Sequence, residues 1–142
     1  MQARMKNPAV LIPDAMKALL ALNASIEGKL PRKTIDLCHL RVSQMNGCAV
    51  CLDMSKRTDE KLERVLTVSA WRDSPYFTDA ERAALALSEA ITELPVPDDV
   101  WEEARKHYEE EQLAALVLHA TLTNVWNRLN VSTRAVPGEK NW

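Results

Sequence analysis

The stretch that decides the fold is TDAERAALALSEAITEL, residues 78–94. Thr78 and Glu81 have the spacing of a capping box, in which each side chain bonds a backbone amide at the start of a helix. Good helix formers follow, and Pro95 and Pro97 stop the segment. The stretch therefore predicts a helix that starts after Thr78 and ends before Pro95.

Helix patterns fill most of the chain on either side of this stretch. A short helix is expected to begin near Cys48 and to continue, with a bend, to Trp71. The chain has three glycines and lacks the alternation typical of a half-buried sheet. We therefore expect an all-α fold, a single domain over residues 1–142 that forms a bundle of about six to seven helices. Four further segments show helical spacing or helix-start signals: 8–27, 31–45, 98–108 and 110–134.

The last of these segments is apolar around most of its circumference between Leu113 and Leu122. A helix of this kind belongs in a core or between subunits. A domain of 142 residues has a limited interior. We therefore predict that this helix lies in the interface of an oligomer.

Composition and charge limit the possible partners. The formal net charge is −2, and basic residues alternate with acidic ones, so the chain lacks the basic stripe that binds nucleic acid. Neither a secretory signal nor a membrane-spanning run is visible in the sequence. We expect a cytoplasmic protein that binds neither nucleic acid nor membrane. Three cysteines are few for a disulfide scaffold, so a C-x-x-C motif in this compartment indicates redox chemistry or metal binding.

That motif is QMNGCAVCLDMSKR, residues 44–57. On a short helix, Cys48, Cys51 and Ser55 would share one face. The start of a helix stabilises a thiolate, and in such motifs the pKa of one thiol falls to roughly 3.5 to 7.5. The thiolate can attack a peroxide or a disulfide, and the second cysteine then closes an intramolecular bond. The alternatives are two buried cysteines that only fill space, or half of a zinc site.

Three blocks carry a family resemblance: LRVSQMNGCAVCLDM (40–54), SAWRDSPYFTDAERAALALSEAIT (69–92) and NVWNRLNV (124–131). Together they resemble the carboxymuconolactone decarboxylase superfamily, specifically its alkylhydroperoxidase D-like (AhpD-like) members. The resemblance implies an all-helical fold, a homo-oligomer (trimer or hexamer) and a thiol peroxidase reaction that reduces a hydroperoxide. It also implies that Cys51 is the peroxidatic thiol and Cys48 the resolving one.

The chain departs from the family pattern at two site positions. Asp36 stands where the family has a glutamate, and Ser55 stands where it has a histidine. The stretch from Cys51 to Trp71 also looks about one helical turn shorter than is usual in the family. General acid–base help is typically worth about 10²–10⁴-fold, so the incomplete relay predicts slow peroxidase turnover. His39, three residues from Asp36, is a candidate substitute.

Other residues have competing interpretations. His119 interrupts the most apolar helix and is either a second relay candidate or a satisfied interior histidine. Asp36 could also form only an ion pair, with Arg41 or Arg128. Cys38 is expected in the core, and Asn124 and Asn127 are expected to be structural.

The expected partners are a hydroperoxide substrate and a dithiol reductant, either a protein or a cofactor. We expect neither a bound cofactor nor a metal. Zinc ligation by Cys38, His39, Cys48 and Cys51 is unfavourable because adjacent ligands diverge on a helix. Two other functions compete with the peroxidase: a non-enzymatic redox-sensing or structural role, and a lactone decarboxylase-like activity.

Overall fold

The computed structural model describes residues 1–139, and this range contains helices and connections but no strand. The all-α expectation is confirmed. The described range has eight α-helices, more than expected, because Pro13 divides the first segment and the segment after Cys48 is broken by turns. The helices are α1 (Pro8–Leu11), α2 (Pro13–Ile26), α3 (Arg32–Met45), α4 (Ala49–Met54), α5 (Leu62–Thr67), α6 (Asp79–Glu93), α7 (Asp98–His107) and α8 (Glu110–Thr133), with 3-10 turns η1 (Ser55–Arg57) and η2 (Val68–Asp73).

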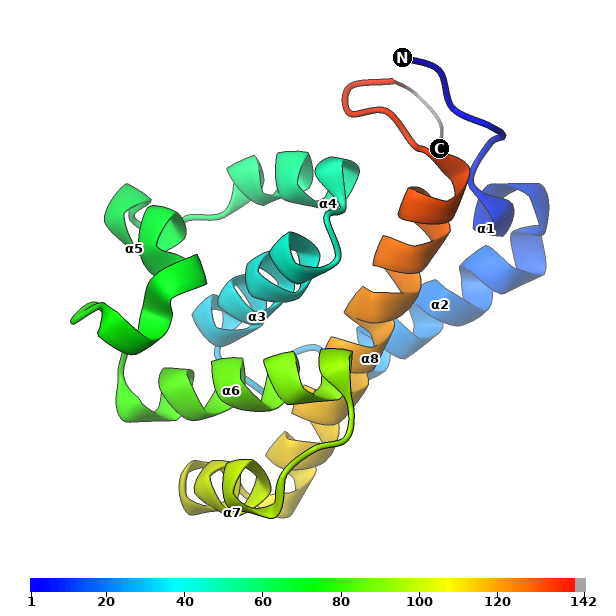
Figure 1. Ribbon diagram of the computed structural model, residues 1–142. Coiled ribbons are helices and arrows are strands. Elements are labelled where there is room, and N and C mark those ends of the chain that lie inside the picture. Colours follow the sequence, from blue (N-terminus) through cyan, green and yellow to red (C-terminus); the bar gives the residue numbers. More distant parts are fainter. Residues whose placement is uncertain (140–142) are drawn as a thin grey trace.

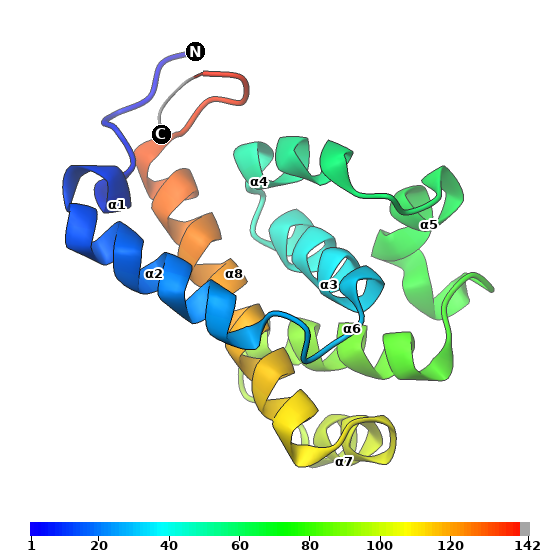
Figure 2. The same cartoon turned by 180° about the vertical axis from the view of Figure 1, so that it is seen from behind.

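Helix α3 lies inside the bundle. It packs against α6 and α8, contacts α4 at one end and contacts η2 along its side (Figure 1). Helix α2 covers the far side of α8, as Figure 2 shows from behind. Both views also place the N-terminal segment beside the C-terminal end of α8. The first and last parts of the described chain therefore meet close to α4, which carries the C-x-x-C motif.

The capping box predicted at residues 78–81 is present. The Glu81 backbone N–H donates to Thr78 Oγ1 at 3.2 Å, and the Thr78 backbone N–H donates to Glu81 Oε2 at 2.9 Å. Helix α6 ends at Glu93, just before Pro95, as expected.

At the end of α3, Gly47 has a φ of +64°, a conformation that glycine adopts without a steric cost. This turn connects the end of α3 to Cys48.

Helix α8 is buried mainly within its own chain. It contacts α2, α3, α4, α6 and α7, and the side chains of Leu113, Leu116 and Leu122 are buried. Five neighbouring helices cover one side of α8, so part of its apolar surface is buried without a partner subunit. Leu118 and Val131 stay exposed on α8, and the oligomer interface stays a prediction.

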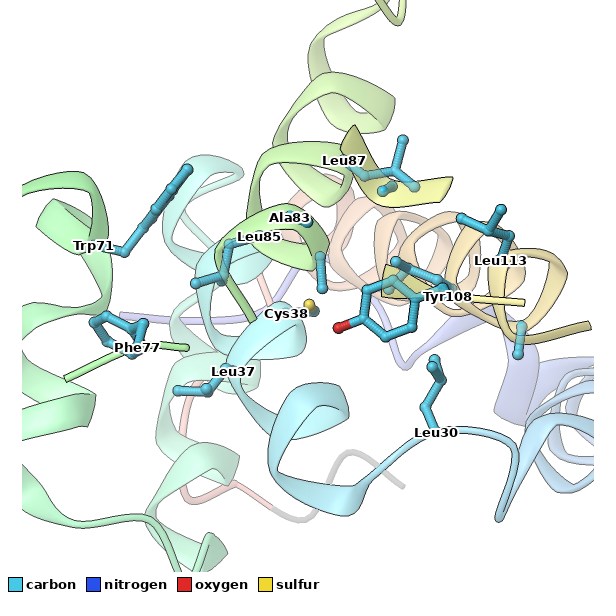
Figure 3. Packing of buried hydrophobic residues seen from close by; sticks show 14 of the residues in the cluster. Leu30, Leu37, Cys38, Trp71, Phe77, Ala83, Leu85, Leu87, Tyr108 and Leu113 are labelled. Atoms are coloured by element: carbon cyan, nitrogen blue, oxygen red, sulfur yellow. The ribbon is translucent and has the colours of Figure 1, made fainter. Parts of the chain in front are cut away.

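The main core forms between α3, α6, α7 and α8 (Figure 3). Cys38 is a free cysteine in this core, where Figure 3 shows it between Leu85 and Tyr108. Burial raises the pKa of the Cys38 thiol to about 12. The expected core role of Cys38 is therefore confirmed, and its thiol remains protonated and unreactive at neutral pH.

Glu89 joins three parts of the fold. Its carboxylate accepts bonds from Arg41 Nε at 2.6 Å, from Trp71 Nε1 at 3.0 Å and from Arg72 Nη2 at 2.8 Å. Burial favours a raised pKa for Glu89, but the hydrogen bonds from Arg72, Trp71 and Arg41 outweigh it and hold the pKa below its ordinary value. The ionised Glu89 side chain therefore links α6 to α3 and to η2.

Candidate active site

Cys48 and Cys51 form a disulfide, with their Cα atoms 5.3 Å apart. Cys48 is the N-cap residue of α4, and its Sγ accepts the Cys51 backbone N–H at 3.3 Å. The two residues are only 1 % and 2 % exposed. The motif thus lies at the start of a short helix, as expected, with its two sulfur atoms bonded to each other and shielded from solvent.

The amide of Asn130 contacts the disulfide from α8. Its Nδ2 donates to Cys51 Sγ at 3.5 Å, and its Oδ1 accepts from Asn7 Nδ2 at 3.1 Å. Both asparagines are buried. Sequence reasoning missed these two residues, although Asn130 lies in the block NVWNRLNV that carries part of the resemblance. The position of Asn130, one helical turn after Asn127, was the available signal.

Asn124 and Asn127 have the structural role expected of them. Both side-chain oxygens accept from Asn46 Nδ2, each at 2.9 Å. Asn127 also donates to Ser43 Oγ at 3.1 Å. These bonds hold the end of α3 against α8 and so fix the turn that precedes Cys48.

Asp36 is paired, but not with the arginines considered from the sequence. Its Oδ1 accepts from Arg32 Nε at 2.9 Å, and its Oδ2 accepts from Thr58 Oγ1 at 3.0 Å. Arg32 is four residues earlier on α3 and shares a face with Asp36, whereas Arg41, five residues later, points elsewhere and binds Glu89. The proposed pairs with Arg41 and Arg128 were therefore wrong.

His39 and Ser55 both approach the backbone of Cys51. Ser55 Oγ donates to the Cys51 carbonyl at 3.2 Å. Burial lowers the pKa of His39, while the Asp36 carboxylate and the backbone of Cys51 favour its charged form and oppose this shift. The imidazole is thus held mainly neutral and able to accept a proton, but neither side chain forms a hydrogen bond to a sulfur atom.

The relay candidates and Cys48 line different cavities. A cavity of about 730 Å³ is lined by Asp36, His39 and Ser55, together with His119. A second cavity, of about 450 Å³, is lined by Cys48 and Asn130 and by Met1 and Gln2 of the N-terminal segment, among others. The structure thus brings Asp36, His39 and Ser55 together at one cavity, whereas Cys48 lines the other and Cys51 lines neither.

His119 is an interior histidine. Its Nε2 lies 3.1 Å from the Ile35 carbonyl, which can only accept, so this nitrogen carries the proton. Burial and, to a smaller extent, the neighbouring His39 lower the pKa of His119 to about 4, although the Ile35 carbonyl and Asp36 oppose the shift. The ring is therefore neutral at physiological pH and is hydrogen-bonded by the backbone of α3.

This shift predicts a pH dependence of stability. The pKa of His119 is about 4 in the folded protein and 6.5 ordinarily, so between these values only the unfolded chain binds the proton. Stability is lost as pH falls through this window, by about 2 kcal/mol between pH 7 and about pH 4.5. Urea unfolding at both pH values should show a loss smaller by this amount in the His119→Gln protein. Equal losses in the two proteins would contradict the assignment.

The described residues offer no obvious metal site or membrane span. Among residues 1–139, no three His, Cys, Asp or Glu side chains gather in a way that could hold a metal ion. In the same range, no helix has the length and apolar character needed to cross a bilayer. Cys48 and Cys51, two of the four zinc ligands considered, are bonded to each other.

Comparison with known proteins shows the family of this chain. The sequence model that defines the carboxymuconolactone decarboxylase family matches residues 13–90 of the chain. The uncharacterized protein YdfG of Bacillus subtilis (strain 168) is 37% identical over 130 residues, which cover 86% of this chain and 88% of YdfG. The chain belongs to the carboxymuconolactone decarboxylase family.

Solved structures define the type more closely. A protein of unknown function from Agrobacterium tumefaciens, described as a putative antioxidant defence protein AhpD, has a TM-score of 0.88 at 33% identity, over 98% of this chain and 100% of that one. The debrominase Bmp8 has a TM-score of 0.79 at 22% identity, over 91% and 73% of the two chains, which shows a shared fold. This chain is an AhpD-like protein, as the resemblance of its sequence implied.

Proposed function

We propose that the protein is a thiol-dependent peroxidase that reduces hydroperoxides with the Cys48–Cys51 pair. The Cys51 thiolate attacks the peroxide oxygen and is oxidised to a sulfenic acid, and the peroxide O–O bond breaks to release an alcohol once a proton is supplied. The Cys48 thiolate then attacks the Cys51 sulfur, forms the disulfide and displaces hydroxide, which takes up a proton to become water. A dithiol reductant supplies two electrons and two protons to restore both thiols.

The observation that carries this proposal is the disulfide itself. Cys48 and Cys51 are close enough to bond within one helical turn, and each sulfur accepts a hydrogen bond from an N–H group. An N–H donor stabilises a thiolate more than a thiol. The same contacts that surround the oxidised pair would therefore favour ionisation of the reduced pair.

Proton transfer is the weak part of the site. Asp36 and His39 line the larger cavity, and neither forms a hydrogen bond to Cys51 Sγ. The Ser55 hydroxyl donates a hydrogen bond to the Cys51 carbonyl, and this side chain has no group that takes up a proton at neutral pH. We therefore propose that Asp36 and His39 give reduced help to the leaving alcohol and that turnover is slow.

Assembly as a trimer or hexamer belongs to the same proposal. Leu20 of α2 and Leu118 and Val131 of α8 are between 41 % and 55 % exposed, and α2 packs directly on α8. Burying such apolar side chains between copies would be favourable. The dithiol reductant and the cytoplasmic location are likewise proposed by analogy with the family.

A single-turnover mass balance tests the peroxidase proposal. Reduced protein is mixed with less than one equivalent of cumene hydroperoxide, and the alcohol is counted by chromatography. We expect one alcohol and one Cys48–Cys51 disulfide for each hydroperoxide consumed, seen as the loss of two hydrogens in the intact mass. Alcohol formed without thiol loss would show that another chemistry is at work.

A redox sensor is the second candidate, and burial favours it. Both cysteines are nearly inaccessible, and the histidine typical of the family is absent. The cysteine pair of a sensor would be oxidised once by the hydroperoxide and would stay oxidised. Repeated alcohol formation in the presence of dihydrolipoamide or another dithiol would exclude this role, whereas a single turnover would support it.

A further inference from the structure

Three buried polar groups form a chain that ends at Cys51 Sγ. The Ala9 backbone N–H donates to Asn7 Oδ1 at 2.9 Å, Asn7 Nδ2 donates to Asn130 Oδ1 at 3.1 Å, and Asn130 Nδ2 donates to Cys51 Sγ at 3.5 Å. The middle bond joins residues 123 positions apart in the sequence. The N-terminal segment is therefore connected to the reactive pair through one side chain of α8.

The first bond fixes the direction of all the others. A backbone N–H can only donate, so the oxygen of the Asn7 amide must face Ala9, and its NH₂ group must face Asn130. The oxygen of Asn130 must then face Asn7, which leaves its NH₂ group facing the sulfur. An amide can otherwise turn over and exchange its oxygen and nitrogen. Here a turn of the Asn130 amide would leave two NH₂ donors facing each other, and a turn of the Asn7 amide would leave two acceptor oxygens facing each other.

The backbone of Asn130 is fixed as well. Arg134 has a φ of +54°, and the N–H of Ala135 donates to the Asn130 carbonyl at 2.9 Å while that of Arg134 donates to the Val131 carbonyl at 3.1 Å. This is the Schellman arrangement that ends a helix. Arg4 adds a backbone bond to the Thr133 carbonyl at 2.8 Å, which attaches the N-terminal segment to the same helix end. Asn130 is thus held by its backbone and by its side chain.

We infer that Asn130 is a catalytic residue that stabilises the Cys51 thiolate by donating a hydrogen bond to its sulfur, and that Asn7 is the positioning residue that orients the Asn130 amide. A donor aimed at the sulfur favours the charged form, both when Cys51 attacks a peroxide and when it leaves a disulfide under attack by a reductant. The inference rests on the proposed function for its role in turnover. The ionisation of Cys51 can be measured without peroxide.

The test follows the pH dependence of alkylation by iodoacetamide in a Cys48→Ser background. Cys51 is then the reactive thiol, since Cys38 is buried and stays protonated. Adding Asn130→Ala should move the titration midpoint upward by about one pH unit, because it removes one hydrogen bond to the charged form. Adding Asn7→Ser, which retains a good helix cap for α1, should move it in the same direction by less.

The two changes should not add. Because Asn7 acts on the sulfur only through Asn130, Asn7→Ser should have no further effect once Asn130 is alanine. Thr123→Val is the matched control: it removes a buried hydroxyl that bonds the His119 carbonyl, two turns earlier on α8, and should leave the midpoint in place. Thermal unfolding followed by circular dichroism identifies any variant that has lost its fold.

The outcomes separate the two proposals. An unchanged midpoint in folded Asn130→Ala protein would overturn the role of Asn130. An Asn7→Ser shift that persists without Asn130 would overturn the orientation mechanism. A shifted midpoint in a protein that consumes no peroxide would leave this inference standing and would instead remove the peroxidase function.

Discussion

Peroxide consumption by the Cys51→Ser protein should fall by at least about three orders of magnitude, to the rate without protein, because the serine hydroxyl is a poor nucleophile at neutral pH. Ferrous oxidation–xylenol orange assays with a dithiol reductant provide the measurement. The control is Cys38→Ala, which removes a thiol that lies in the core. It should retain the activity of the parent protein.

The Cys48→Ser protein separates the two cysteine roles. Without a resolving thiol, Cys51 should react once with peroxide and stop as a sulfenic acid, which dimedone traps. If instead Cys48→Ser abolished the first reaction and Cys51→Ser allowed it, the roles of the two cysteines would be reversed. Full activity in both variants would exclude the dithiol mechanism altogether.

Replacing Glu89 with alanine should lower the free energy of unfolding by about 3 to 5 kcal/mol, since it leaves Arg41 partly buried without its carboxylate and the Trp71 N–H without an acceptor. Urea unfolding followed by circular dichroism measures this loss. Glu93→Ala is the matched control, because Glu93 lies one turn later on α6 and is exposed. Its effect should stay below about 1 kcal/mol.

A small loss in Glu89→Ala would mean that Arg41 and Arg72 find solvent or other partners when the carboxylate is removed. In that case the three bonds to Glu89 would not fix η2 against α6. The segment between α4 and α6 would then be held by its other polar contacts with α6, the Arg64–Glu81 ion pair and the Arg82 bond to the Trp71 carbonyl, and by apolar contacts.

Local signals in the sequence were enough to predict most of the helices. The capping box at Thr78 defines the start of α6, and Asn46 and Gly47 mark the end of α3, because these signals act within a few residues. Pro13 lies in the first turn of α2, which suits a proline, but the separate short helix α1 before it was missed. The packing of α8 could not be predicted, since it depends on how five helices from distant parts of the chain surround it.

The candidate site also has residues that could be predicted from the sequence and residues that could not. Cys48 and Cys51 are recognised from their spacing, and their bond needs only one helical turn. Asn130 contacts the sulfur, and Asn7 contacts Asn130, through tertiary contacts. The spacing of Asn127 and Asn130 indicates a shared helix face but not a contact with Cys51. The separation of Asp36 and His39 from the sulfur atoms, in a cavity of their own, likewise follows from how α3 and α4 pack.

The most direct test of the redox mechanism is a stopped-flow measurement on the fully reduced protein at neutral pH. Thiol loss is followed after mixing with excess hydroperoxide, beside free cysteine under the same conditions. Because Asn130 and the Cys51 backbone N–H both donate to the sulfur pair, we predict that thiol loss is faster than for free cysteine and ends in the Cys48–Cys51 disulfide. A rate no faster than that of free cysteine, or oxidation that never forms this bond, would contradict thiol peroxidase catalysis by this protein.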